Sequence, residues 1–320
     1  MQLFTDEQLD RAEAYLAAEK YDEIRPALEG LVADAQTYID ETYEPDDKTQ
    51  WFSFANQFEL LTYKRVEQDP RELKPAARPF DRAFADLAFC EMQMEDFEPA
   101  AEHLKQAVRW NPMNCAHRLN LAVALGNCGD LEESLRMTYS VFARASHSSH
   151  LVRAYTNFAD YFVRCEQYET AAACVKCGLR MHPDDHRLNN MATELALKHQ
   201  TNPNEQTDEL TESLLDAQGI PQTANVEVVL SALLLADIAA AREDMQTCQD
   251  MAQVAVDLVG QERATALAQM VREAGEDAYP EEGGAAPLGS DATDDAAQAA
   301  LDAATRAARA GADAAVSKGA

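Results

Sequence analysis

The chain has 320 residues, a formal net charge of −29 and seven cysteines. This acid excess opposes binding to nucleic acids and to anionic membranes, because both attract clustered lysine and arginine side chains. Residues Met1–Glu7 contain neither a basic region nor an apolar run, so we expect no secretory signal and a cytoplasmic location. The odd number of cysteines favours reduced thiols over a disulfide framework.

The first 80 residues divide into two predicted segments. Residues 1–44 are predicted to form a divergent helix pair whose corner lies at Tyr21. Residues 45–80 are predicted to contain an aromatic helix, followed by a connection in which Pro70, Pro75 and Pro79 exclude a continuous helix. The residues of the aromatic helix are Trp51, Phe52, Phe54, Phe58 and Leu61.

Three stretches in the centre, 81–114, 115–148 and 152–185, have similar residues at equal offsets. Each has a large and then a small apolar residue in its first helical pattern, namely Leu87-Ala88, Leu121-Ala122 and Phe158-Ala159. A corner then precedes Phe97, Leu131 or Tyr168, and Phe97 and Leu131 are 34 residues apart. This period is typical of a helix-turn-helix repeat that buries its apolar face only by stacking on neighbours.

The three copies differ at a few places. Asp86 stands where the other copies have Asn120 and Asn157, and Ser146 stands where a proline is expected. About three additional residues are placed within 147–151.

Residues 186–275 are predicted to form divergent helical repeats. Helices are expected at about 186–199 and 208–218, and a helix pair at 225–258 with its corner at Met245. The apolar stretch from Val228 to Ala241 is too short to span a bilayer and is better interpreted as a buried helix. Residues 276–320 are rich in Ala, Gly and Asp and are predicted to form a disordered acidic tail.

The three central copies resemble the tetratricopeptide repeat family. The resemblance implies an all-α, right-handed solenoid of helix pairs whose first helices line a concave groove. It also implies a groove that binds a protein or an extended or helical peptide through amide, guanidinium and apolar side chains. The corresponding positions here are Arg82, Phe89, Leu119, Asn120, Val123, Asn127, Arg153, Asn157 and Arg164. The alternative interpretation is that these positions simply face solvent.

One subclass of the family consists of co-chaperones that grip the carboxylate terminus of heat-shock chaperones. Asn120 matches the middle requirement of that clamp. Ala85 and Phe89 stand where a basic residue and an asparagine are needed, and Asn157 replaces the second basic residue beside Arg153. We therefore expect this clamp to be absent.

Signals of catalysis or metal binding are weak. Cys174 and Cys177 have metal or redox spacing, but they fall within a predicted second helix without a second cysteine pair, so we interpret them as packing residues. Four histidines at the corners between repeats are assigned capping roles: His147, His150, His182 and His186. The sequence has no nucleophile elbow, phosphate loop or dinucleotide fingerprint. We expect no enzymatic activity, cofactor or metal.

Two functions remain after these comparisons of motifs. The favoured one is a non-catalytic scaffold or adaptor that binds a protein or peptide in its groove. The alternative is a peptide-responsive regulatory sensor resembling bacterial repeat proteins, although such sensors usually have a DNA-binding or catalytic module that is not evident here. The sequence leaves the partner, the pathway and the oligomeric state open.

Overall fold

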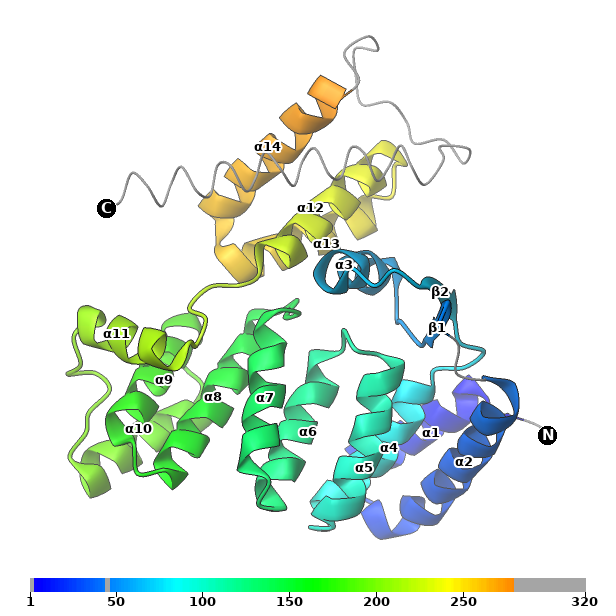
Figure 1. The fold of residues 1–320 in the computed structure, drawn as a ribbon, viewed down its shortest axis with the longest axis horizontal. Coiled ribbons are helices and arrows are strands. Elements are labelled where there is room, and N and C mark those ends of the chain that lie inside the picture. The colour runs from blue at the N-terminus through cyan, green and yellow to red at the C-terminus, as the bar shows by residue number, and fades with distance from the viewer. Residues whose placement is uncertain (1–2, 44–46, 279–320) are drawn as a thin grey trace. The chain divides into compact units, whose positions relative to one another are not determined.

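A computed structural model describes residues 3–43 and 47–278 (Figure 1), and these are predominantly helical, with two short strands. The chain divides into two compact units, the first made mainly of residues up to Gln222 and the second of residues from Thr223 onward. The predicted segment 186–275 is therefore shared between the two units. In the described part of the chain, no helix is long and apolar enough to cross a membrane.

The first unit consists of consecutive helices and one small sheet. Its helices are α1 (Asp6–Ala17), α2 (Tyr21–Thr42), α3 (Gln57–Glu67), α4 (Phe80–Gln93), α5 (Phe97–Trp110), α6 (Cys115–Asn127), α7 (Leu131–Phe142), α8 (Ser148–Arg164), α9 (Tyr168–Met181), α10 (His186–His199) and α11 (Asp208–Gln218). Helix α1 packs on α2, α2 on α4, α4 on α5, α5 on α6 and α6 on α7. Helix α1 also contacts α4, and α4 contacts α6, so the first helices of neighbouring pairs meet.

The same backbone corner joins the two helices of several pairs. In the corner between α4 and α5, Glu95 has a φ of 63°, and the next N–H, that of Asp96, donates to the carbonyl of Glu91 at 2.9 Å. This is the bonding of a Schellman motif, in which a left-handed residue lets the chain satisfy a carbonyl of the last helical turn. Among the described residues the motif occurs in the corners of five helix pairs, at the left-handed residues Glu19, Glu95, Gly129, Glu166 and Glu243, and it also ends α11, where the N–H of Ile220 donates to the carbonyl of Leu215 across Gly219.

The five corners include those of the two divergent pairs. Lys20 N–H donates to the carbonyl of Tyr15 at 3.0 Å, and Asp244 N–H donates to that of Ala239 at 2.9 Å. Tyr21 and Met245 then begin the second helices, as predicted. The pairs α1–α2 and α12–α13 therefore share the local geometry of the central copies although their sequences differ.

The corner residues Phe97, Leu131 and Tyr168 each begin a second helix and are half-buried. The ring of Tyr168 stacks on the ring of His199 in α10, with their centroids 3.7 Å apart. This aromatic corner thus also contacts the following pair. Helices α9 and α10 pack tightly at Gly178, where a Cβ atom would lie 2.5 Å from a methyl carbon of Leu188.

The core lies between the helices and contains large aromatic residues. Phe80, Phe84 and Trp110 are fully buried, and the rings of Phe80 and Trp110 lie 4.8 Å apart. The first core cluster joins residues of α1, α2, α4 and α5, so it holds the predicted divergent pair against the first central pair. Leu87 and Leu121, the large members of their apolar pairs, are also buried.

The predicted aromatic helix is wrong in its first half. Trp51 and Phe52 belong to strand β1 (Thr49–Phe52), and the helix α3 begins only at Gln57. Strand β1 pairs in parallel with β2 (Glu72–Pro75), in the register Trp51 opposite Lys74. An aromatic run suits a strand as well as a helix, and here pairing with a segment some 20 residues further on decides the outcome.

Strands β1 and β2 with α3 form an insert, defined here as residues 49–75, between α2 and α4 (Figure 1). Its small core contains Phe52 and Tyr63 and includes Met113 from the α5–α6 connection. Ser53 N–H donates to the carbonyl of Trp110 at 2.8 Å. Arg144, just after α7, forms an ion pair with Glu67. The insert is therefore attached to the ends of the central helix pairs.

Helix α8 begins at Ser148, so the additional residues predicted within 147–151 mostly lengthen this helix. His150 accordingly lies inside α8 and not in a corner, which corrects its predicted position. The predicted helices 186–199 and 208–218 coincide with α10 and α11. Side-chain oxygens of Asp185 and Thr207 accept from the N–H groups of Leu188 and Leu210 and fix where these helices start.

The second unit contains α12 (Val226–Ala241), α13 (Met245–Val259) and α14 (Gln261–Ala278), each of which packs on the other two. Helix α12 has buried residues on most of its circumference, in agreement with the prediction of a buried helix. Helix α14 includes residues 276–278, which were predicted to belong to the tail. The rest of that predicted tail, 279–320, lies outside the described residues.

Candidate binding surface on the first helices

The predicted groove residues belong to α4, α6 and α8, the first helices of the central pairs. Polar contacts connect each first helix to the next: Arg82 of α4 reaches α1, Asp81 of α4 reaches His117 of α6, and Asn120 of α6 meets Arg153 of α8. The exposed and half-buried side chains of α1, α4, α6, α8 and α10 lie on the first helices of their pairs. We call them the first-helix surface.

The end of this surface at α1 and α4 is acidic. Arg82 donates to Glu13 at 2.7 Å and to Asp10 at 3.0 Å, so its charge is balanced within the chain. Asp86, one turn further along α4, has a side-chain oxygen without a hydrogen-bond partner. Burial, followed by the negative charge of Glu13, raises the pKa of Asp86 to about 7. This carboxyl group is therefore only partly ionised at neutral pH.

The opposite end, at α8 and α10, is cationic. Arg153 Nη2 donates to Asn120 Oδ1 at 2.8 Å, which brings two predicted residues together. Part of the Arg153 side chain is exposed, yet the surrounding protein and, secondly, the charge of Arg187 lower its pKa. Asn157, one turn after Arg153, has a buried amide nitrogen with no hydrogen-bond partner. Asn120 and Arg153 are therefore in contact, and Asn157 lies on the same helix as Arg153.

Arg164 and Asn127 make local contacts at the end of the first helices. Arg164 pairs with Asp160 at 3.1 Å and donates to the carbonyl of Gly126 at 2.9 Å. Asn127 is exposed and donates to the carbonyl of Val123, one turn earlier in α6. Arg164 thus links α8 to the end of α6, and both side chains are already engaged within the chain.

The apolar positions differ in accessibility. Phe89 is 36 % exposed and its ring meets that of Tyr21 edge to face, while Val123 is half-buried. Leu119 is completely buried, so its prediction as a groove residue is wrong. It belongs to the buried stripe of α6 together with Cys115 and Ala122, because residues at spacings of three and four share one helix face.

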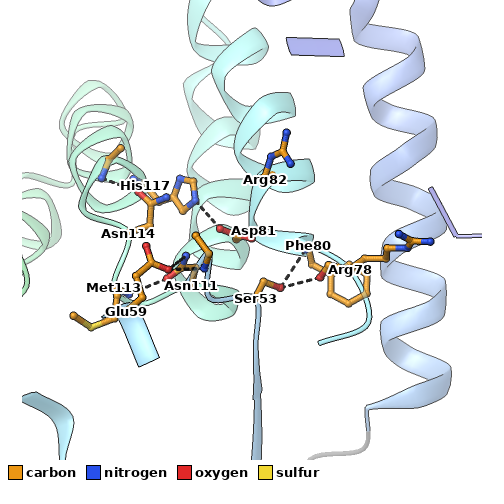
Figure 2. A network of polar contacts seen from close by, with 12 residues as sticks. Ser53, Glu59, Arg78, Phe80, Asp81, Arg82, Asn111, Met113, Asn114 and His117 are labelled. Atoms are coloured by element: carbon orange, nitrogen blue, oxygen red, sulfur yellow. Dashed lines mark hydrogen bonds and ion pairs between the residues drawn. The ribbon is translucent and has the colours of Figure 1, made fainter. Parts of the chain in front are cut away.

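A second set of polar side chains is buried where the insert meets α4 and α6, as Figure 2 shows. His117 Nε2 lies 3.2 Å from Asp81 Oδ2, and both residues are more than nine-tenths buried. Glu59 of α3 accepts from Asn111 Nδ2 at 3.0 Å, and Asn111 Oδ1 accepts from the N–H of Met113. Burial raises the pKa of Glu59.

The connection into α4 is held by a serine of the insert (Figure 2). Ser53 Oγ donates to the carbonyl of Arg78 at 3.0 Å and accepts from the N–H of Phe80 at 3.2 Å. Since the Asp81–His117 pair is buried, it is closed to a substrate, and we assign the whole network to holding the insert against the helices.

Cys174 and Cys177 lie in α9, where Cys174 is completely buried and Cys177 almost so. Burial raises the pKa of both thiols, so neither is activated as a nucleophile. Within the described ranges, no group of three or more His, Cys, Asp or Glu side chains is placed to hold a metal ion.

Sequence reasoning missed two residues of the first-helix surface. Arg187 follows Arg153 by 34 residues, one repeat period, so the period itself could have identified it. Asp86 was noted only as a departure from asparagine, and its raised pKa depends on neighbours that packing brings together. Comparison with protein-family models and with curated proteins gave no match to this chain.

Proposed function

We propose that this chain is a non-catalytic scaffold of the tetratricopeptide repeat type, a solenoid of helix pairs that binds a protein or peptide on its first-helix surface. The observation that supports the repeat assignment is the Schellman corner, which recurs in five helix pairs of the described chain with the same hydrogen bond. The contacts between successive helices also suit a stack in which each pair packs on its neighbours.

The first-helix surface suits recognition of an extended chain. It presents amide, guanidinium and carboxyl groups along α4, α6 and α8, together with the exposed ring of Phe89. Such groups bind backbone amides and charged side chains, while an exposed aromatic ring accepts an apolar side chain. The acidic and cationic ends would give a bound chain a preferred direction.

The test is isolation of a partner from the native host, followed by measurement of its affinity for variants of the full chain. We expect Val123→Asp and Arg153→Glu to weaken binding about tenfold or more, because the first puts a charge on the middle helix of the surface and the second reverses a charge at its cationic end. Arg136→Glu is the matched control, since Arg136 is an exposed arginine on the second helix α7. It should leave the affinity unchanged.

Thermal unfolding of the variants must accompany these measurements, so that lost binding is not confused with lost folding. If a partner binds wild type and all three variants equally well, the proposed surface is wrong. If its binding depends on Arg136 instead, the second helices form the binding surface.

A further inference from the structure

Helix α11 does not pair with the helix that precedes it. In the pairs α4–α5, α6–α7 and α12–α13 the second helix packs on the first. Helix α11 instead packs on α9, the second helix of the preceding pair, and makes no comparable contact with α10. It therefore lies on α9 as an added segment and not as half of a repeat.

Charged and polar contacts hold the start of this segment, which we define as residues 206–221 and call the α11 segment. Asp208 pairs with Lys176 at 2.8 Å and also with Arg180, and both basic residues belong to α9. Gln206 Nε2 donates to a backbone carbonyl of α9 at 2.8 Å. The side chain of Asp208 is 67 % exposed, so water and salt weaken its ion pairs.

Two tyrosines hold the end of the α11 segment. The hydroxyl of Tyr139 in α7 donates to the carbonyl of Gln218 at 2.6 Å, and the hydroxyl of Tyr155 in α8 donates to the carbonyl of Pro221 at 2.9 Å. Both bonds use only the backbone of the segment, so they do not require particular side chains at these two positions. The surface that the segment covers therefore extends over α7, α8 and α9.

The α11 segment buries few side chains. Thr211 and Leu215 are the buried residues of α11, and Ile220 after it is 2 % exposed. Helix α9, by contrast, buries all of residues 170–175. A helix of 11 residues is marginally stable by itself, and a segment with few buried apolar contacts opens at a lower free energy than the core beneath it. We therefore expect the α11 segment to open while α9 stays folded.

We propose that the α11 segment is a releasable cover over a helix-binding site formed by α7, α8 and α9. The segment itself shows which partner fits: an amphipathic helix with an acidic residue in its first turn, apolar residues at the positions of Leu215 and Ile220, and free backbone carbonyls at its end. The two basic residues of α9 bind the acid, and the two tyrosine hydroxyls bind the carbonyls. The site uses other residues than the first-helix surface and does not depend on the proposed function.

Native-state hydrogen exchange of the full wild-type chain tests whether the cover opens. The amides of residues 211–218 in α11 should exchange at least about a hundredfold more rapidly than those of residues 172–175 in α9, because only a local opening is needed. Exchange of both helices at the same rate would mean that α11 opens only when the whole unit unfolds, and would overturn the proposal.

A synthetic peptide of residues 204–222 serves as the partner helix. Fluorescence anisotropy measures its affinity for wild type and for the double variant Asp208→Lys with Leu215→Ala, which weakens the chain's own segment and leaves the site intact. We expect the double variant to bind the peptide at least about tenfold more tightly, because the tethered segment of wild type competes at an effective concentration on the order of millimolar. The same peptide carrying both substitutions is the control and should not bind.

Two results of this experiment would refute the site. One is a double variant that is folded by circular dichroism and does not bind the peptide. The other is unfolding of α9 together with α11 in the double variant, since the segment would then belong to the core.

A matched pair of lysine variants, each made in the double variant, tests the contact residues. Lys176→Gln removes a partner of the acidic residue and should raise the dissociation constant of the peptide about threefold. Lys105→Gln is the control, because Lys105 is an ion-paired lysine on another second helix, α5, and should leave the affinity unchanged. Equal effects of the two would place the peptide elsewhere. Loss of peptide binding in Val123→Asp would assign the peptide to the first-helix surface instead.

Discussion

The backbone N–H of Asp130 donates to the carbonyl of Leu125 at 3.0 Å, across the left-handed residue Gly129. The corners of four other described helix pairs make the same bond, but each of these four has a glutamate in the left-handed position. A side chain in that conformation is strained, whereas glycine is not. The backbone strain of this corner is therefore smaller in the α6–α7 pair, which has glycine, than in the four pairs that have glutamate.

Exchanging the residues at two corners should change stability in opposite directions. Gly129→Ala should lower the free energy of unfolding by about 1 kcal/mol, because alanine is strained at a φ of 87° although no atom lies near its Cβ. Glu166→Gly should raise it by about 0.5 kcal/mol, since glycine relieves strain but gains freedom in the unfolded chain. Urea unfolding followed by circular dichroism measures both. Stability changes of the same sign in both variants would contradict the left-handed conformation of these two residues.

Charge placed in the core should unfold the first unit. Leu121→Asp buries a carboxylate where Leu121 is 3 % exposed, and we expect a loss of about 3 kcal/mol or more. Leu197→Asp is the control, because Leu197 is 79 % exposed and the same substitution there should change stability by less than about 0.5 kcal/mol. Thermal and urea unfolding of the full chain would show the difference, and equal losses would mean that Leu121 is not in a packed core.

Neutralising Asp86 should stabilise the chain in a pH-dependent way. The pKa of Asp86 is raised to about 7 in the folded chain, against about 3.9 when unfolded, so the folded state holds a proton that the unfolded state releases between these values. The carboxyl therefore becomes progressively more destabilising as the pH rises from about 4 to about 7, and the effect is constant above that. Asp86→Asn should increase stability at pH 8 by at least about 1.4 kcal/mol, the value of one pKa unit.

The advantage of Asp86→Asn should shrink as the pH falls and be absent below about 4, where Asp86 is protonated in both states. Melting temperatures at pH 4, 6 and 8 measure this dependence. Asp34→Asn, a change at an exposed acid on α2, is the control and should show no such trend. If the melting temperatures of Asp86→Asn and wild type differ by the same amount at all three pH values, Asp86 is not the group that titrates.

The cysteines should differ in reactivity according to burial. Burial raises the pKa of Cys115 to about 12 and that of Cys174 well above its usual range, and both thiols are inaccessible. Cys128 is exposed and should react with iodoacetamide at least about a hundredfold faster than either, because the buried thiols react only after local opening. Mass spectrometry of timed samples measures the rates. Rapid labelling of Cys174 would show that its thiol is accessible to the reagent in the folded chain.

The sequence predicts elements well where local signals coincide. The bounds of α10 and α11 follow from a capping residue at each start, Asp185 and Thr207, and α11 ends before Gly219, which has a positive φ. The strand at Trp51 could not be distinguished from a helix, because its parallel partner lies beyond α3. The repeat period correctly predicted that Asn120 and Arg153 lie on neighbouring first helices. It did not predict that Leu119 is buried, because helical spacing alone does not show which residues of a helix the next helix covers.

The two ends of the insert are held together. The N–H of Ala77 donates to the hydroxyl of Tyr43 at 2.9 Å, and α2 packs directly on α4. The chain thus leaves the helix array after α2 and returns to it before α4 at points that one tyrosine side chain joins. Deletion of the insert would therefore expose the ends of the central helices that it now covers, while α2 and α4 would still pack directly on each other.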